Sequence, residues 1–179
     1  MNVRLRLPLL VTVLALGAVV LAGCGKPDRP AGTNQATSPS GPPAPDISVA
    51  TIDGERFALA QQRGRPVLLF FMAGWCTTCV PVAQDIDRLT KGKDAPQDLV
   101  VLVVGADSTE TAADLAAFRQ RAGGPSKHWA LDSTRQITRA YGVTALDTTV
   151  LIDRQGQIAF RNTSKQSLAT MTQQVVSLR

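Results

Sequence analysis

The chain has 179 residues and a formal net charge of +5, from 19 Lys and Arg against 14 Asp and Glu. This positive excess is small and scattered along the chain, which argues against a nucleic-acid partner. The sequence contains no internal repeat and only three cysteines, Cys24, Cys76 and Cys79.

The first residues resemble an export signal. Two arginines precede an apolar run over residues 7–22, which is short for a transmembrane helix of about 20 apolar residues. The run leads into LAGC (21–24), which resembles the lipobox of bacterial lipoproteins. That resemblance implies a signal peptide over residues 1–23 and a lipid on Cys24. The alternative is an ordinary cleaved signal that ends beside a chance cysteine.

Residues 24–45 are expected to form the lipidated cysteine and a flexible tether. Gly, Pro, Ser and Thr dominate this segment, so it buries too little apolar surface to offset the entropy lost on ordering. Residues 46–179 then have the size of one compact domain. Because acyl chains on Cys24 would anchor the chain, we expect a membrane-anchored lipoprotein of the bacterial cell envelope that faces the extracytoplasmic side.

Within the domain, the hydrophobic pattern predicts strands that alternate with helices. Continuous apolar runs predict buried strands, and alternation around Asp-Gly predicts a hairpin. The expected strands lie at 46–60 (a hairpin), 66–73, 98–106, 128–132 and 148–161 (a second hairpin). The expected helices lie at 77–91, 109–122, 132–141 and 164–178. The second helix has a capping box, either Asp107 with Glu110 or Thr111 with Asp114, and Gly123 as its stop.

This order predicts an α/β sandwich whose central sheet is mixed, mostly parallel with an antiparallel hairpin at one edge. Four segments resemble TlpA-like thiol–disulfide oxidoreductases, the exported, membrane-tethered members of the thioredoxin superfamily. They are PAPDISVATIDGERFALAQQRGRPVLLFFMAGWCTTC, VVLVVGADSTETAADLAAFRQRAG, HWALD and YGVTALDTTVLIDRQGQIAFR. The resemblance covers residues 45–179. It implies a thioredoxin-like three-layer sandwich with an N-terminal β-hairpin and a TlpA-like central insertion.

Cys76 and Cys79 stand where the first long strand is expected to meet a helix. Unpaired N–H groups and the macrodipole at a helix N-terminus stabilise a thiolate. Cys76 is therefore expected to be the nucleophile, and Cys79 the thiol that resolves the mixed disulfide. A structural disulfide and a metal site are the alternatives. So small a loop gains little stability from a disulfide by chain entropy, which favours the redox interpretation.

The residues next to the pair are expected to support it. Trp75 matches the exposed tryptophan of the family, although simple packing explains it equally well. Thr77 and Thr78 match neither the Gly-Pro of reducing thioredoxins nor the Pro-His of strong oxidants, so the direction of exchange stays open. The only histidine, His128, is expected to be structural.

Three positions depart from the family pattern. The family places acids at the positions of Phe70 and Val82, and a cis-proline at the position of Asp147. A cis bond before a non-proline residue costs about 2.5–4 kcal/mol, so the loop at Asp147 is either strained or trans. The resemblance places Asp147 against the cysteines, where a carboxylate would raise the pKa of a thiol and could accept its proton. The alternatives are a tolerated loop residue and a ligand in a zinc site with the two thiolates.

Together, these features predict an extracytoplasmic thiol–disulfide oxidoreductase that acts through Cys76 and Cys79. Its partners would be cysteine-containing exported proteins and a membrane thiol–disulfide electron donor or acceptor, and its only redox group would be its own disulfide. The rival interpretation is a non-catalytic thioredoxin-fold lipoprotein that binds a metal or a partner protein.

Overall fold

The computed structural model describes residues 41–124 and 127–178. The predicted signal peptide (1–23), Cys24 and most of the predicted tether lie outside the described residues. Within the described ranges, no helix is both long enough and apolar enough to cross a membrane. Residues 42–45, at the end of the predicted tether, bond to the domain: the N–H of Ile158 donates to Pro42 O at 2.8 Å.

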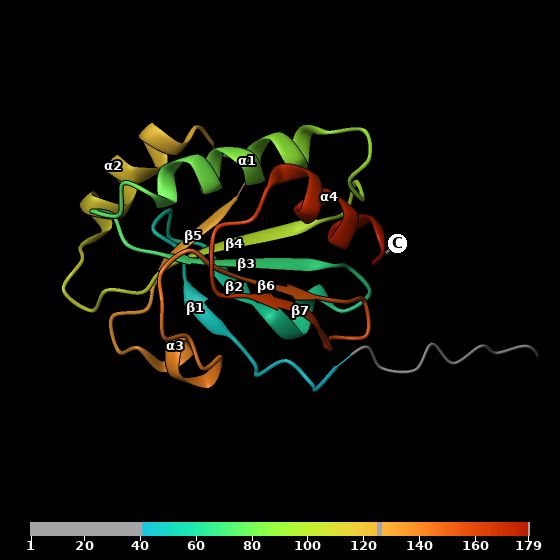
Figure 1. Ribbon diagram of the computed structural model, residues 1–179. Coiled ribbons are helices and arrows are strands. Elements are labelled where there is room, and N and C mark those ends of the chain that lie inside the picture. Colours follow the sequence, from blue (N-terminus) through green and yellow to red (C-terminus); the bar gives the residue numbers. More distant parts are fainter. Residues whose placement is uncertain (1–40, 125–126, 179) are drawn as a thin grey trace, which may run out of the picture. The chain divides into compact units, whose positions relative to one another are not determined.

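A mixed five-stranded sheet forms the middle of the domain (Figure 1). The strands lie in the order β5-β4-β3-β6-β7, with β3, β4 and β5 parallel and with β6 and β7 antiparallel to their neighbours. A separate antiparallel hairpin precedes them. The strand bounds are β1 Ser48–Ala50, β2 Arg56–Ala58, β3 Val67–Met72, β4 Val100–Gly105, β5 His128–Leu131, β6 Thr148–Ile152 and β7 Ile158–Asn162.

Helices cover both faces of this sheet, which gives the predicted three layers. Helices α1, α2 and α4 lie on one face, and α3 lies with the β1–β2 hairpin on the other (Figure 1). Their bounds are α1 Cys79–Lys91, α2 Ala112–Ala122, α3 Gln136–Ala140 and α4 Leu168–Val176, and a short 3-10 helix spans Leu59–Gln62. The thioredoxin-like fold predicted from the sequence is confirmed.

The two central strands follow directly from the sequence. Every residue of β3 and β4 is buried, as expected of apolar runs covered on both faces. Two hydrophobic clusters result, one on each side of the sheet. Trp129 and Phe118 lie in the first cluster and Tyr141 in the second, so all three aromatic side chains pack in the core.

The structure selects one of the two capping boxes proposed for α2. The hydroxyl of Thr111 accepts from the N–H of Asp114, whose carboxylate accepts from the N–H of Thr111. Gly123 ends the helix in the left-handed region, with φ 73°. This capping leaves Asp107 and Glu110 free to contact the segment ahead of the cysteines, as described below.

A buried lysine fixes the helix that carries Cys79. The Nζ of Lys127, whose side chain is 0% exposed, lies 3.4 Å from Asp87 Oδ1 and donates to Ala83 O at 3.2 Å. Both partners belong to α1, so this contact ties the helix to the segment that leads into β5. Burial lowers the pKa of Lys127 and the Asp87 carboxylate opposes that shift.

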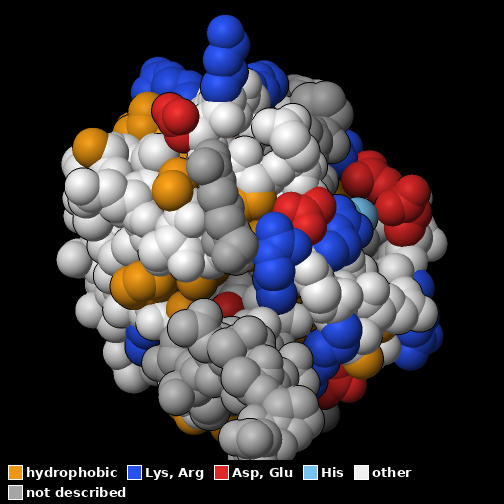
Figure 2. Space-filling view, turned by 90° about the vertical axis from the view of Figure 1, so that its right-hand side faces the viewer, with side chains coloured by type: hydrophobic (Ala, Val, Ile, Leu, Met, Phe, Trp, Pro, Cys, Tyr) orange, Lys and Arg blue, Asp and Glu red, His pale blue; other side chains and the backbone are white. Residues whose placement is uncertain are grey.

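Charged side chains are distributed without a basic stripe on the face shown in Figure 2. The described Lys and Arg side chains there are interspersed with Asp and Glu. This distribution agrees with the small net charge of the sequence.

Candidate active site

Cys76 and Cys79 form a disulfide between the end of β3 and the start of α1. The two residues differ in exposure: Cys76 is 6% exposed and Cys79 is 0% exposed. Both cysteines are buried, and Cys76 is the more accessible of the two.

The helix begins later than the sequence pattern predicts. Cys79, and not Cys76, is its first residue, and Thr78 precedes it without a side-chain capping bond. The N–H of Cys79 donates to Cys76 O at 3.3 Å, and the N–H of Val80 donates to Thr77 O at 3.4 Å. Pro81 contributes no N–H. In this oxidised form the first turn therefore offers Cys76 fewer free N–H donors than a helix that begins at Cys76 would.

Asp147 lies beside the disulfide. One carboxylate oxygen and the two Sγ atoms of Cys76 and Cys79 all lie within 4.8 Å of one another. Asp147 Oδ2 accepts from the hydroxyl of Thr78 at 3.2 Å, and that hydroxyl also lies 3.4 Å from the Sγ of Cys76. Among the described residues, Asp147 Oδ1 is buried without a hydrogen-bond partner.

The backbone at Asp147 differs from that of the family's cis-proline. The described part of the chain contains no cis peptide bond, so the bond before Asp147 is trans. Asp147 has φ 62°, in the left-handed region, which Asp enters more readily than most residues because its short polar side chain hydrogen-bonds locally. Of the two conformations expected from the sequence, a strained cis bond or a trans bond, the loop takes the trans bond.

The two positions where the family carries acids hold core residues. Phe70 is 0% exposed and Val82 is 1% exposed, and both belong to the cluster on the α1 side of the sheet. The polar residues farther along α1 are engaged elsewhere: Gln84 donates to Arg121 O, and Asp85 pairs with Arg88. Within the described ranges, Asp147 is the only acid grouped with the two cysteines.

Charged residues that follow β4 hold the backbone just ahead of the cysteines. The N–H of Gly74 donates to the Glu110 carboxylate, and Arg121 Nη2 donates to Gly74 O at 2.5 Å. Trp75, 66% exposed, donates from Nε1 to Asp107 Oδ2 at 2.8 Å. Asp107, Glu110 and Arg121 were not predicted as residues of this site from the sequence. One signal in the sequence was available. Asp107 and Glu110 follow β4, which is parallel to β3, so the carboxyl ends of both strands lie at the same edge of the sheet.

Glu110 is an unusual member of this group. Burial raises its pKa, the Gly74 N–H opposes that shift, and the nearby Asp107 and Asp114 carboxylates add to it. Its Oε2 is buried with no hydrogen-bond partner among the described residues. By contrast, the N–H of Thr109 and the indole of Trp75 lower the pKa of Asp107.

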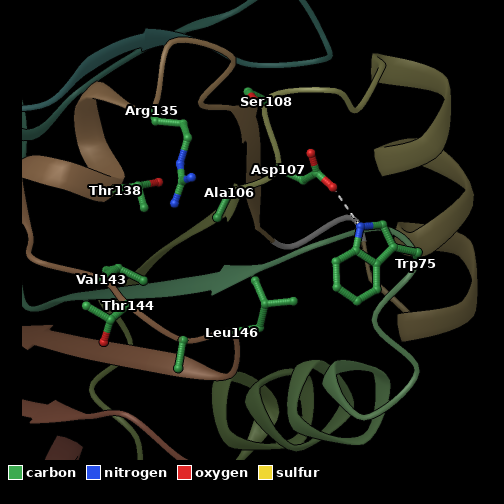
Figure 3. Close-up of a pocket in the computed structure, with 10 residues that line it drawn as sticks. Trp75, Ala106, Asp107, Ser108, Arg135, Thr138, Val143, Thr144 and Leu146 are labelled. Atoms are coloured by element: carbon green, nitrogen blue, oxygen red, sulfur yellow. Dashed lines mark hydrogen bonds between the residues drawn. The ribbon is translucent and has the colours of Figure 1, made fainter.

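A cavity of about 340 Å³ opens beside Trp75 (Figure 3). The residues that lead to Asp147, namely 143–146, form one wall, and Asp107 lies near Trp75 on another. The Arg135 side chain extends into the space between them (Figure 3). The cavity is large enough for a peptide side chain, and Trp75, which lies next to Cys76, forms part of it.

The remaining predicted residues lie where the sequence suggested or at the edge of the site. Thr78 contacts both Cys76 and Asp147, whereas Thr77 contributes its carbonyl to the helix start. His128 lies on β5, where its ring packs 5.3 Å from that of Phe57, in agreement with a structural role.

Comparisons with known proteins agree with this geometry. The Redoxin family matches residues 39–175. The chain is 28% identical over 118 residues to the thiol-disulfide oxidoreductase ResA of Geobacillus thermodenitrificans, which covers 66% of each protein. It is 30% identical over 119 residues to the thioredoxin-like protein YneN of Bacillus subtilis, covering 66% of this chain and 68% of that one. The chain thus spans about two thirds of the length of these relatives.

A solved structure gives the same fold. A protein of Chlorobium tepidum, described as the thiol:disulfide interchange protein DsbE, superimposes with a TM-score of 0.68 at 25% identity. The superposition covers 77% of this chain and 96% of that protein. The chain therefore belongs to the Redoxin family and is a thioredoxin-superfamily oxidoreductase with a CxxC disulfide.

Proposed function

We propose that this protein is an extracytoplasmic, lipid-anchored thiol–disulfide oxidoreductase that exchanges disulfides with cysteines of exported proteins. The observation that carries the proposal is the unequal exposure of the pair: Cys76 is 6% exposed and Cys79 is 0% exposed. Cys76 is then the nucleophile that meets the substrate, and Cys79 is the resolving thiol. The relatives described as thiol-disulfide oxidoreductases and as a thiol:disulfide interchange protein support this assignment.

The reaction is balanced with the two thiols alone. In the reducing direction, the Cys76 thiolate attacks a substrate disulfide, and one substrate sulfur leaves as a thiolate that takes up a proton. Cys79 then loses its proton and attacks the Sγ of Cys76, which releases the second substrate sulfur and forms the Cys76–Cys79 disulfide. Two electrons pass to the substrate, and a membrane thiol–disulfide partner restores the dithiol. The oxidising direction is the reverse, and no further cofactor takes part.

Asp147 is proposed as the group that accepts the proton of Cys79. Among the described residues it is the acid that groups with the two cysteines, and Phe70 and Val82 occupy the positions of the family's acids. Its hydrogen bond from Thr78 orients one oxygen, and the other oxygen has no hydrogen-bond partner among the described residues. A positioned general base contributes typically 10²–10⁴-fold to a proton transfer.

The anchor is proposed from the sequence. The LAGC segment supports lipid attachment at Cys24, and the Gly- and Pro-rich residues after it support a tether long enough to hold the domain off the membrane. In this arrangement Trp75, Thr77 and Thr78 surround the reactive sulfur at the surface that a substrate would meet.

The test is the exchange activity of the full chain and of three variants with a model disulfide substrate. We expect Cys76→Ser to abolish turnover and Cys79→Ser to accumulate a mixed disulfide between residue 76 and the substrate. Cys24→Ser, assayed in detergent, is the control that keeps turnover and loses the lipid. Absence of a covalent adduct at residue 76 in Cys79→Ser would refute the catalytic assignment. Metal retained through purification without turnover would favour the rival binding protein.

A further inference from the structure

The three side chains assigned to thiol exchange also present a convergent set of metal-ligand atoms. Two sulfurs and a carboxylate oxygen, from Cys76, Cys79 and Asp147, converge within 4.8 Å. The Oδ1 of the same carboxylate is buried, and no hydrogen bond satisfies it within the described ranges. A buried acceptor without a partner destabilises the folded protein unless a hydrogen-bond donor or a cation binds to it.

The chemistry of these three atoms fits one class of cation. Thiolate sulfur and carboxylate oxygen both bind Zn²⁺, at about 2.3 Å and about 2.0–2.2 Å. Ligands at those distances around a tetrahedral centre lie about 3.5–3.8 Å apart. Reduction breaks the bond between the two sulfurs and lets them separate toward this spacing. The Asp147 oxygen then has to approach by about 1 Å. Sulfur ligands disfavour Mg²⁺ and Ca²⁺, which take oxygen ligands.

We propose that the reduced protein binds a zinc-class divalent cation through Cys76, Cys79 and Asp147, with the fourth position open to water. The disulfide form offers no thiolate, so the same residues bind the cation only after reduction. The site is therefore gated by the redox state of the chain. It depends on Asp147, which occupies the position where the family carries proline, and it does not depend on turnover.

The proposed steps are balanced. Binding replaces the protons of two thiols by one cation and transfers no electrons, so the dithiol and Zn²⁺ give a zinc dithiolate and two protons. When a substrate disulfide oxidises the pair, two electrons pass from the two sulfurs to that disulfide. The cation leaves as Zn²⁺ with its charge unchanged.

Cobalt binding tests the proposal, with Co²⁺ alone as the spectroscopic probe and Zn²⁺ as the competitor. The full chain is used in a Cys24→Ser background, so that Cys76 and Cys79 are its only thiols. We expect the reduced chain to bind one Co²⁺ with a thiolate-to-metal charge-transfer band, and Zn²⁺ to displace it. The oxidised chain is expected to show no band.

Two matched variants identify the carboxylate. Asp147→Asn keeps the size of the side chain and, like Asp, tolerates the left-handed backbone, and we expect it to weaken Co²⁺ and Zn²⁺ binding at least tenfold. Asp53→Asn makes the same change in the exposed turn between β1 and β2 and should leave affinity unchanged. Failure of the reduced chain to bind one equivalent, or equal affinity in the parent chain and Asp147→Asn, would overturn the proposal.

Binding should also appear in the redox equilibrium. Free Zn²⁺ at a hundred times its dissociation constant favours the reduced form about a hundredfold, which raises the reduction potential by about 60 mV. An unchanged potential would again contradict the site. Exchange activity measured with a chelator present separates the two proposals, because it tests turnover without the cation.

Discussion

Substitution of Gly74 by alanine tests how tightly the segment ahead of Cys76 is held. A Cβ at Gly74 would lie 2.9 Å from Glu110 Oε1 and 3.2 Å from Asp114 O. The first neighbour is the end of a side chain, but the second is backbone in the first turn of α2 and moves only with the helix. Overpacking of this kind costs about 1–3 kcal/mol. We therefore expect Gly74→Ala to lower the Tm by roughly 4 °C per kcal/mol, measured by thermal unfolding of the oxidised chain.

A double-mutant cycle with Glu110→Ala separates the two contacts. Removal of the carboxylate leaves only the Asp114 contact, so the cost of Gly74→Ala should fall in the Glu110→Ala background by more than about 0.5 kcal/mol. Additive effects would show that Glu110 does not crowd residue 74. A Gly74→Ala chain as stable as the parent would refute the close packing of Glu110 and Asp114 against residue 74.

The other predictions concern Glu110 and Thr111, which lie between β4 and α2. Because burial raises the pKa of Glu110, the folded chain keeps a proton that the unfolded chain has lost at pH values just above the ordinary pKa of 4.5. Stability should therefore fall as pH rises through that window, and Glu110→Gln should flatten this profile in urea unfolding; parallel profiles would contradict the assignment. Thr111→Ala removes the α2 cap and should cost about 1 kcal/mol in the same assay, whereas a loss within error would show that the cap contributes nothing.

Much of the fold was predictable because its signals are local. The apolar runs of β3 and β4 have no polar residue that would suit an exposed face, and Gly54 and Gly156 take the positive φ that the two hairpin turns require. The start of α1 was not predictable in the same way. Carbonyls of Cys76 and Thr77 bond the first N–H groups in tight turns, and side-chain periodicity cannot distinguish these turns from a helix.

The residues of the site were likewise predictable only in part. The Cys76–Cys79 pair follows from its spacing, and the position of Asp147 follows from the resemblance. Glu110 and Arg121 were missed because they contact Gly74 across 36 and 47 residues of sequence, where no short pattern links them. Only the pairing of β3 with β4 brings these segments together.

The change at residue 147 alters the backbone as well as the side chain. Proline holds φ near −65°, whereas Asp147 has φ 62°, so a proline cannot replace it in the present loop. The same loop forms a wall of the cavity beside Trp75, and its conformation brings the Asp147 carboxylate to Thr78 and the two sulfurs. Residue 147 therefore contributes a left-handed backbone to the loop that lines the cavity and a carboxylate beside the reactive pair. Both follow from a residue that tolerates the left-handed region and carries a carboxylate.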